Sequence, residues 1–178
     1  PAEMRGSIGG MSKETVPEQT STYDVVVIGG GPAGENVAQY AIENTDLTAV
    51  LVEGELLGGE CSYYACMPSK AFLVPIEVAA ASVNLGGLRP AELSAVDLLE
   101  RRDEWVSHYD DAGQVSWAEG AGLDVVRGWA RLDGERRVAV RTAEGERVLR
   151  ARRAVVLATG AQPVMPAAFQ GLEAWDSR

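Results

Sequence analysis

A glycine-rich turn between a short apolar run and a helix-like segment constrains the fold of this chain more than any other feature. Residues 24–28 form a β-branched apolar run, which is typical of a buried parallel strand. The pattern G-x-G-x-x-G follows at residues 29–34, and residues 33–44 are expected to form a helix with one apolar face. With a second strand expected at residues 47–52, these segments predict a βαβ unit.

This turn indicates a site for the pyrophosphate of a dinucleotide, because it follows a strand and opens a helix. Gly29 would make the tight turn, Gly31 would let the pyrophosphate approach the backbone, and Gly34 would pack the helix on the strand. The helix N-terminus offers free N–H groups and a positive dipole end to the phosphates. Glu53 ends the second strand, where an acid accepts hydrogen bonds from ribose hydroxyls. The motif predicts an ADP-containing dinucleotide but does not by itself separate FAD from NAD.

The rest of the chain adds helices, a small antiparallel unit and a closing strand. Helices are expected at residues 68–82, with a kink or an end at Pro75, and at residues 91–108. The second of these helices would bury a stripe made of Leu93, Val96, Leu99 and Val106. Strands are expected at residues 123–131, 136–142, 146–150 and 154–158, the middle two forming a hairpin or meander. This order predicts an α/β fold with a parallel central sheet and a small antiparallel β-meander insert.

Charge and composition narrow the classes of function. Sixteen basic and 26 acidic residues give a net charge of −10, which argues against nucleic-acid binding and against docking on an anionic membrane. No apolar run approaches the roughly 18 residues of a transmembrane helix, and no secretory signal is visible, so a cytoplasmic location is expected. One histidine and two cysteines are poor material for a zinc site, so no metal is expected. We expect residues 1–22 to form a flexible N-terminal tail and residues 23–178 to form the folded part.

Two cysteines, Cys61 and Cys66, lie at the mouth of a glycine-rich loop and near an expected helix start. A helix N-terminus lowers the pKa of a thiol, because its dipole favours the thiolate. Lys70 follows Cys66 by four residues on the same helical face and would add positive charge. These features indicate a redox-active pair, while two free structural cysteines in the core remain the alternative.

The segment G-G-x-C-x-x-x-x-C-x-P-S-K at residues 58–70 resembles the class I pyridine nucleotide-disulfide oxidoreductases, and residues 154–160 are similar to the strand and Ala-Thr-Gly turn of that family. The resemblance extends from about Tyr23 to Arg178 and implies a Rossmann-like FAD-binding fold of three layers. It implies that electrons pass from NAD(P)H to FAD, then to a disulfide between Cys61 and Cys66, and then to a disulfide or another small-molecule acceptor.

The same resemblance implies roles for individual residues. Cys61 would be the interchange thiol that attacks the substrate, and Cys66 would face the flavin as its charge-transfer partner. The residues implied to bind FAD are Gly29, Gly31, Pro32, Ala33, Gly34, Glu53, Gly59, Glu60, Lys70, Ala130, Thr159 and Gly160. Among these, Glu53 would bind the adenosine ribose, Lys70 would lie near the isoalloxazine, and the backbone of Ala130 would contact the adenine.

Near the cysteines the sequence departs from the family pattern. Glu60 stands where the family usually has Thr, and its negative charge should disfavour the thiolate at Cys61. Tyr63 and Tyr64 lie between the cysteines, where the family has a Leu-Asn-Val-Gly type of segment. These bulky side chains favour the hypothesis that they gate or stack a small planar acceptor, such as a quinone, in place of the usual disulfide substrates.

Other parts of the family pattern are missing from the sequence. Relatives carry a second G-x-G-x-x-G domain for NAD(P)H and an interface domain that supplies a His–Glu pair across a homodimer. The only histidine, His108, is expected to be a solvated residue at a helix end. We therefore expect the first part of an FAD domain, truncated before the nicotinamide domain and inactive alone. The alternatives are a binding module without catalysis and an NAD-dependent dehydrogenase, which the cysteine motif disfavours.

Two further sets of residues are expected to have structural roles only. The tryptophans are expected to be packing residues and not a stacking platform; they are Trp105, Trp117, Trp129 and Trp175. A group of arginines is expected to form a solvated face of the meander; these are Arg147, Arg150, Arg152 and Arg153.

Overall fold

The computed structural model describes residues 19–173 and contains one six-stranded sheet in the order β3-β2-β1-β6-β5-β4. The strands are β1 (Gln19–Ile28), β2 (Ala49–Glu53), β3 (Asp124–Arg127), β4 (Trp129–Leu132), β5 (Arg137–Thr142) and β6 (Gly145–Leu157). The helices are α1 (Pro32–Ile42), α2 (Gly59–Tyr63), α3 (Cys66–Val83), α4 (Ala95–Trp105) and α5 (Ala112–Gly120), with short 3-10 turns η1 (Ser107–Tyr109) and η2 (Ala167–Phe169).

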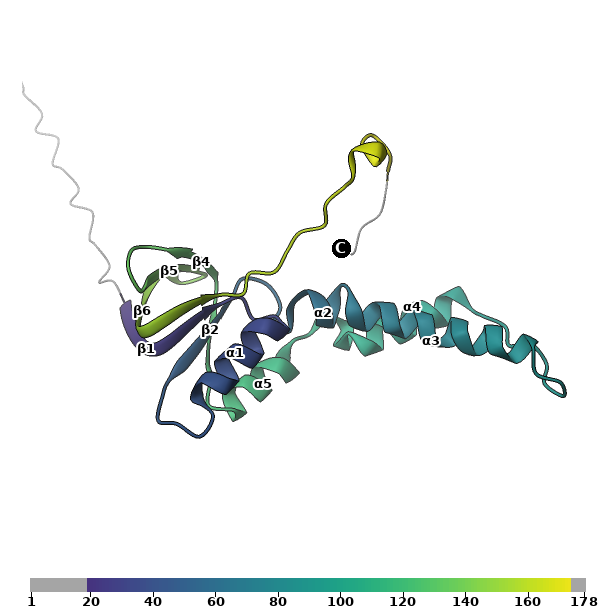
Figure 1. Cartoon of the computed structure of the whole chain (residues 1–178), viewed down its shortest axis with the longest axis horizontal. Coiled ribbons are helices and arrows are strands. Elements are labelled where there is room, and N and C mark those ends of the chain that lie inside the picture. Colours follow the sequence, from purple (N-terminus) through teal and green to yellow (C-terminus); the bar gives the residue numbers. More distant parts are fainter. Residues whose placement is uncertain (1–18, 174–178) are drawn as a thin grey trace, which may run out of the picture.

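The sheet combines a parallel part and an antiparallel part. Strands β3, β2, β1 and β6 pair in parallel, whereas β4, β5 and β6 pair antiparallel to one another. Helices α1 and α5 cover one side of the parallel strands, and the strands of the meander curl over the other side (Figure 1). The prediction of a three-layer α/β fold with a parallel sheet and a small antiparallel meander is confirmed.

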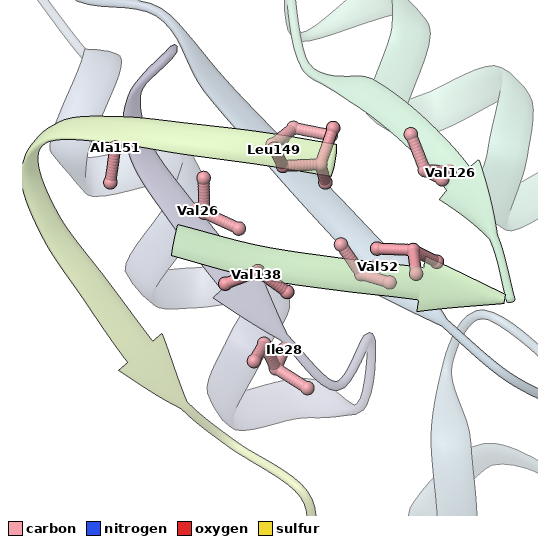
Figure 2. Close-up of a cluster of buried hydrophobic side chains, with 9 residues drawn as sticks. Val26, Ile28, Val52, Val126, Val138, Leu149 and Ala151 are labelled. Carbon is pink, nitrogen blue, oxygen red and sulfur yellow. The ribbon is translucent and has the colours of Figure 1, made fainter. Parts of the chain in front are cut away.

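The core divides between the two faces of the parallel strands. Alternate residues of β1 point to opposite faces, as the two-residue period of a strand requires. Val26 and Ile28 pack with Val138 and Leu149 of the meander, as Figure 2 shows. Val25 and Val27 belong to the other cluster, which includes Ala38 of α1 and Ala118 of α5. Burial on both faces explains why residues 25–28 form a continuous apolar run.

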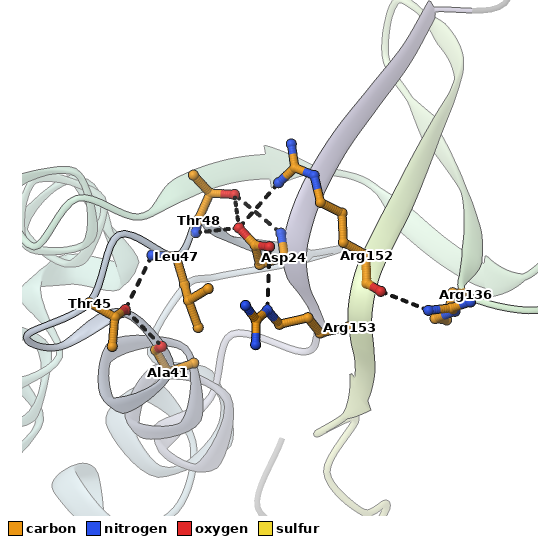
Figure 3. Close-up of polar contacts among 8 residues, drawn as sticks. All are labelled: Asp24, Ala41, Thr45, Leu47, Thr48, Arg136, Arg152 and Arg153. Atoms are coloured by element: carbon orange, nitrogen blue, oxygen red, sulfur yellow. Dashed lines mark hydrogen bonds and ion pairs between the residues drawn. The ribbon is translucent and has the colours of Figure 1, made fainter.

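A polar cluster fixes an irregularity in β1 next to this core. The pairing of β1 with β6 shifts register between Tyr23 and Val25. At this point the Asp24 carboxylate accepts hydrogen bonds from the backbone N–H and the hydroxyl of Thr48, both at 3.0 Å. Arg152 donates to the same carboxylate at 3.1 Å (Figure 3). The Thr48 hydrogen bonds lower the pKa of Asp24, so the carboxylate stays charged and links β1 to β6 and to the start of β2.

Helices α2, α3 and α4 form an arm that extends away from the sheet (Figure 1). Helix α3 begins at Cys66 and continues through Pro75, so the expected end of the helix at this proline is wrong. The guanidinium of Arg101 in α4 donates to the carbonyl of Ala71 in α3 at 3.1 Å and joins the two helices.

The apolar stripe expected on the second helix of this arm is mostly wrong. Val106 is buried, but Leu93, Val96 and Leu99 are 50, 73 and 48% exposed. The periodic pattern was correct for a helix, yet α4 packs on α3 in the arm and not on the sheet (Figure 1).

Several element boundaries also differ from the predictions. Strand β1 begins at Gln19, five residues before the run expected at residues 24–28, because its first half pairs with β6. The expected flexible tail is therefore wrong for residues 19–22, and its residues 1–18 lie outside the described residues. The strand expected at residues 123–131 is divided by Gly128, whose φ of +156° turns the chain from β3 into β4. The run at residues 154–158 is not a separate strand, because residues 154–157 continue β6. Helix α5 was not predicted, since only Ala118 in it is fully buried.

One finding bears on the absence of a membrane segment expected from the sequence. Among residues 19–173, the helical stretch Gly59–Val83 is long and apolar enough to cross a bilayer by length and composition, with a mean hydropathy of 1.3 over its best window. The expectation that no run approaches this length is therefore wrong for this stretch. The expectations of a cytoplasmic location and no membrane partner stay predictions.

Candidate dinucleotide site and cysteine pair

A cavity of about 380 Å³ lies at the carboxyl ends of β1, β2 and β6. This is the edge at which open parallel sheets bind their ligands. Eight of the residues predicted to bind the cofactor line it, namely Gly29, Gly31, Glu53, Gly59, Glu60, Ala130, Thr159 and Gly160. The lining does not include Pro32, Ala33, Gly34, Lys70 or either cysteine. The structure therefore brings the glycine-rich turn, Glu53, residues 59–60 and residues 159–160 together around one cavity. The two cysteines lie just outside this cavity.

The glycine-rich turn between β1 and α1 leaves no room for side chains. Gly29 has a φ of +103°, and a Cβ there would overlap the carbonyl oxygen of Ala158. A Cβ at Gly34 would overlap the carbonyl oxygen of Gly29, so this glycine lets α1 pack directly on the turn. Gly31 is the N-cap of α1 and no side chain caps the helix, which leaves its first N–H groups available to an anion.

Glu53 connects this turn to the loop that follows β2. Its carboxylate accepts the backbone N–H of Gly30 at 2.7 Å and that of Glu55 at 2.8 Å. A carboxylate has about four acceptor positions, so two hydrogen bonds leave capacity for hydroxyl groups in the cavity. The position of Glu53 fits the role predicted for it at a ribose.

An ion pair that the sequence analysis did not predict, between Asp111 and Arg127, anchors the loop at residues 54–58. The Asp111 carboxylate accepts the backbone N–H of Leu57 at 2.6 Å and also accepts a hydrogen bond from Arg127. Arg127 donates a second hydrogen bond to the carbonyl of Glu55 at 2.6 Å. Because Asp111 precedes α5 and Arg127 ends β3, the pair fixes one wall of the cavity to the rest of the fold.

The helix that carries the first cysteine begins against the glycine-rich turn. Gly59, the first residue of α2, has a φ of +58°, and a Cβ there would lie 2.7 Å from the Cα of Gly31. Cys61 is the third residue of α2, and Cys66 is the first residue of α3. Both are free thiols; Cys61 is partly buried and Cys66 is exposed. The alternative of two buried structural cysteines is therefore wrong for Cys66.

The electrostatics of Cys61 differ from the helix-start prediction. A hydrogen bond with Cys66 and, next, burial raise the pKa of the Cys61 thiol above its usual value. The charge of Lys70 acts in the opposite direction and lowers the pKa. The lowered pKa expected at a helix start is therefore wrong for Cys61, because the hydrogen bond with Cys66 and burial act in the opposite direction. The largest cause of the shift is Cys66, and the effect expected from the charge of Glu60 stays a prediction.

We expect alkylation of Cys61 in the reduced protein to follow a titration with a midpoint above about 8.5, the usual pKa of a free thiol. Cys66→Ala removes the hydrogen bond that raises the pKa and should move the midpoint to lower pH. Lys70→Met removes the charge that lowers it and should move the midpoint to higher pH. Iodoacetamide labelling across pH, read by mass spectrometry for each cysteine, measures these shifts.

Ser69→Ala alters an exposed neighbour of Lys70 without a change in charge and should leave the midpoint where it is. A midpoint that stays unchanged in Cys66→Ala would contradict the assigned coupling between the two thiols.

The two tyrosines between the cysteines have different environments. Tyr63 is 4% exposed, and burial together with the charge of Asp111 raises its pKa, so it is a neutral core residue. Tyr64 lines the cavity, and its ring centroid lies 5.8 Å from that of Tyr109. The hypothesis that both tyrosines stack an acceptor is wrong for Tyr63 and now depends on Tyr64 alone.

His108 lies in η1 directly after α4 and is exposed, as expected for a solvated histidine near a helix end. Sequence reasoning missed several residues of the cavity wall, among them Gly54, Gly128 and Trp129. Gly54 and Gly128 carried a weak signal, since Gly54 directly follows Glu53 and Gly128 lies two residues before Ala130.

The chain belongs to the pyridine nucleotide-disulphide oxidoreductase family, which matches residues 23–177. It is 38% identical over 148 residues to dihydrolipoyl dehydrogenase 3 of Pseudomonas aeruginosa, covering 80% of this chain and 31% of that protein. It is 30% identical over 151 residues to the soluble pyridine nucleotide transhydrogenase of Hahella chejuensis, covering 81% of this chain and 32% of that protein. The chain thus spans about a third of the length of these curated relatives.

A solved structure supports the fold. The chain is similar to the HOCl-induced flavoprotein disulfide reductase RclA from Escherichia coli, solved as a Cu(II) complex, with a TM-score of 0.67 and 23% sequence identity. The match covers 83% of this chain and 30% of that protein. The family relationship predicted from the cysteine segment and the Rossmann-like fold are both confirmed.

Proposed function

We propose that this chain supplies the FAD-binding part of an NAD(P)H-dependent flavoprotein disulfide oxidoreductase, with Cys61 and Cys66 as its redox-active pair. The observation that carries the proposal is the contact between Gly59 and Gly31. It places the helix of Cys61 directly against the turn that would hold the pyrophosphate. A cofactor seated on that turn would extend along the cavity toward the cysteine pair.

The residues of the cavity fit FAD. The turn at residues 29–34 presents backbone without side chains, and Glu53 retains acceptor capacity for ribose hydroxyls. Thr159 and Gly160 follow β6 and line the wall next to the turn. Bound FAD would accept a hydride from NAD(P)H and supply electrons to the thiol pair, chemistry that belongs to the cofactor. The chain would bind it, orient it and position the thiols.

The chemistry of the cysteines can be written from the chain alone. In the reduced pair, the Cys61 thiolate would attack one sulfur of a substrate disulfide, form a mixed disulfide and release one substrate thiol. The Cys66 thiolate would then attack Cys61 in the mixed disulfide, release the second substrate thiol and leave a Cys61–Cys66 disulfide. Two electrons thus pass from the pair to the substrate. Lys70 would favour the thiolate at Cys61, in line with its effect on the pKa.

The wider features of the whole enzyme belong to the same proposal. They are a homodimer, NAD(P)H as co-substrate, a small-molecule acceptor and a cytoplasmic location. Tyr64 on the cavity wall favours a planar acceptor as a second candidate beside a disulfide.

An absorption experiment tests the proposal. The protein is incubated with FAD, desalted, and its visible spectrum is recorded before and after reduction with dithiothreitol. We expect a retained flavin band that gains a long-wavelength shoulder on reduction, as a thiolate lying against a flavin produces. The shoulder should be absent in Cys66→Ser and present in Cys61→Ser.

Loss of all flavin on desalting would contradict the proposed FAD site. Retained flavin with the same shoulder in Cys66→Ser would keep the site and contradict the role of Cys66. A binding module without catalysis would retain flavin but reduce no acceptor in the presence of NAD(P)H.

A further inference from the structure

Trp129, which the sequence suggested to be a packing residue, lies on the wall of the cavity. It is the first residue of β4, it is 57% exposed, and its neighbours in the lining include Glu53, Gly54 and Ala130. Burial therefore does not explain this large aromatic side chain. An exposed aromatic ring at a cavity is a surface for a ligand with a flat face.

The indole ring of Trp129 lies close to the backbone of Gly54. A Cβ at this position would lie 2.8 and 2.9 Å from Cδ2 and Cε2 of the ring, closer than real contacts of this kind. The absence of a side chain at residue 54 is thus what allows the ring to lie there. Because 57% of the residue is exposed, ring surface remains available to a ligand.

The order of the cavity residues matches the order of groups in an ADP half. The Glu53 carboxylate accepts the N–H of Gly30 in the glycine-rich turn, while the Glu53 carbonyl accepts the N–H of Gly128 at 2.9 Å. Glu53 therefore lies between the turn and the segment that carries Trp129. If the turn holds the pyrophosphate and Glu53 the ribose, the base lies next to Gly54 and Trp129.

We propose that Trp129 stacks on the adenine of the bound dinucleotide and is a determinant of its affinity. This inference rests on the proposed function and adds a side-chain contact to the backbone contact expected at Ala130. Stacking of a base on an aromatic side chain suits a neutral, flat purine and needs no hydrogen-bond partner. Removal of such a ring weakens binding by about tenfold.

The test uses three variants and two ligands, FAD and ADP, with dissociation constants from isothermal titration calorimetry. Trp129→Ala should raise the dissociation constants of both ligands about tenfold. Trp129→Phe keeps a flat ring, so its dissociation constants should stay within about threefold of wild type. Quenching of tryptophan fluorescence by ADP, which has no flavin, should be lost in Trp129→Phe. Trp105→Phe is the matched control, since Trp105 lies on α4 with Arg101 at 4.6 Å from its ring, and its quenching should equal wild type.

Gly54→Ala is a further variant, in which the indole of Trp129 is present but displaced. It should also weaken the binding of ADP. Trp129→Ala and Gly54→Ala with affinities within about twofold of wild type would overturn the inference. Quenching that persists in Trp129→Phe would overturn it as well. Wild-type protein that binds neither FAD nor ADP would overturn the proposed function, and the inference with it.

Discussion

Under the proposed function, replacing Cys61 or Cys66 by serine is expected to lower disulfide reduction by the whole enzyme about a thousandfold or more. Each serine keeps the size of the side chain but cannot form a disulfide, so the pair can no longer pass two electrons to the substrate. The two thiols act as a unit, and the double replacement should therefore be little worse than either single one. Steady-state oxidation of NAD(P)H with a small disulfide substrate measures the loss.

The control is Ser62→Ala, which alters a residue between the cysteines without touching a thiol. It should keep activity within a small factor of wild type. FAD content is measured on the same samples, so that a loss of activity can be assigned to chemistry and not to loss of cofactor. Near wild-type turnover in Cys61→Ser would contradict thiol–disulfide exchange at this pair.

Gly34→Ala is expected to have the largest effect on stability and on cofactor binding together. The added Cβ would overlap the carbonyl oxygen of Gly29, a backbone atom that cannot move without moving the turn. Overpacking against fixed atoms lowers the free energy of unfolding by about 3 kcal/mol. Displacement of α1 from the turn also moves its N–H groups away from the phosphates, so FAD retention should be lost.

Gly113→Ala is the matched control, because Gly113 lies in α5 and a Cβ there meets nothing within 4 Å. Alanine in a helix is favoured over glycine by about 0.5–1 kcal/mol, so this variant should be as stable as wild type or slightly more stable. Urea unfolding followed by circular dichroism measures both changes. Equal stability of Gly34→Ala and wild type would show that the turn can relax and would contradict the close contact.

The sequence predicted those parts of the fold that depend on neighbouring residues. The run at residues 24–28, the glycine-rich turn and Glu53 lie close together in the chain, so their spacing alone predicts a strand, a turn and an acid at one edge. The hairpin between β5 and β6 was predicted for the same reason, since its alternation and its turn are local signals.

Contacts between distant segments could not be predicted in this way. Asp111 and Arg127 looked like ordinary charged residues. Only the folded chain shows that they form an ion pair and that both donate or accept hydrogen bonds at the loop of residues 54–58. Trp129 became a cavity residue because Gly128 turns the chain between two strands and Gly54 leaves room for the ring. The pKa of Cys61 likewise depends on Cys66, whose thiol lies close only because α3 begins directly after α2.

Strand β6 has a consequence for how segments could be exchanged in this fold. Its residues 147–151 pair with residues 19–23, while residues 154–157 of the same strand pair with residues 25–28 and lead into the wall of the cavity. The meander therefore cannot be deleted as a separate unit, because its deletion would remove half of a central strand. Changes of chain length are tolerated where they leave the ladder intact, at the exposed hairpin tip of residues 143–144. Chimaeras between relatives should be joined at that tip and not at the two ends of the meander.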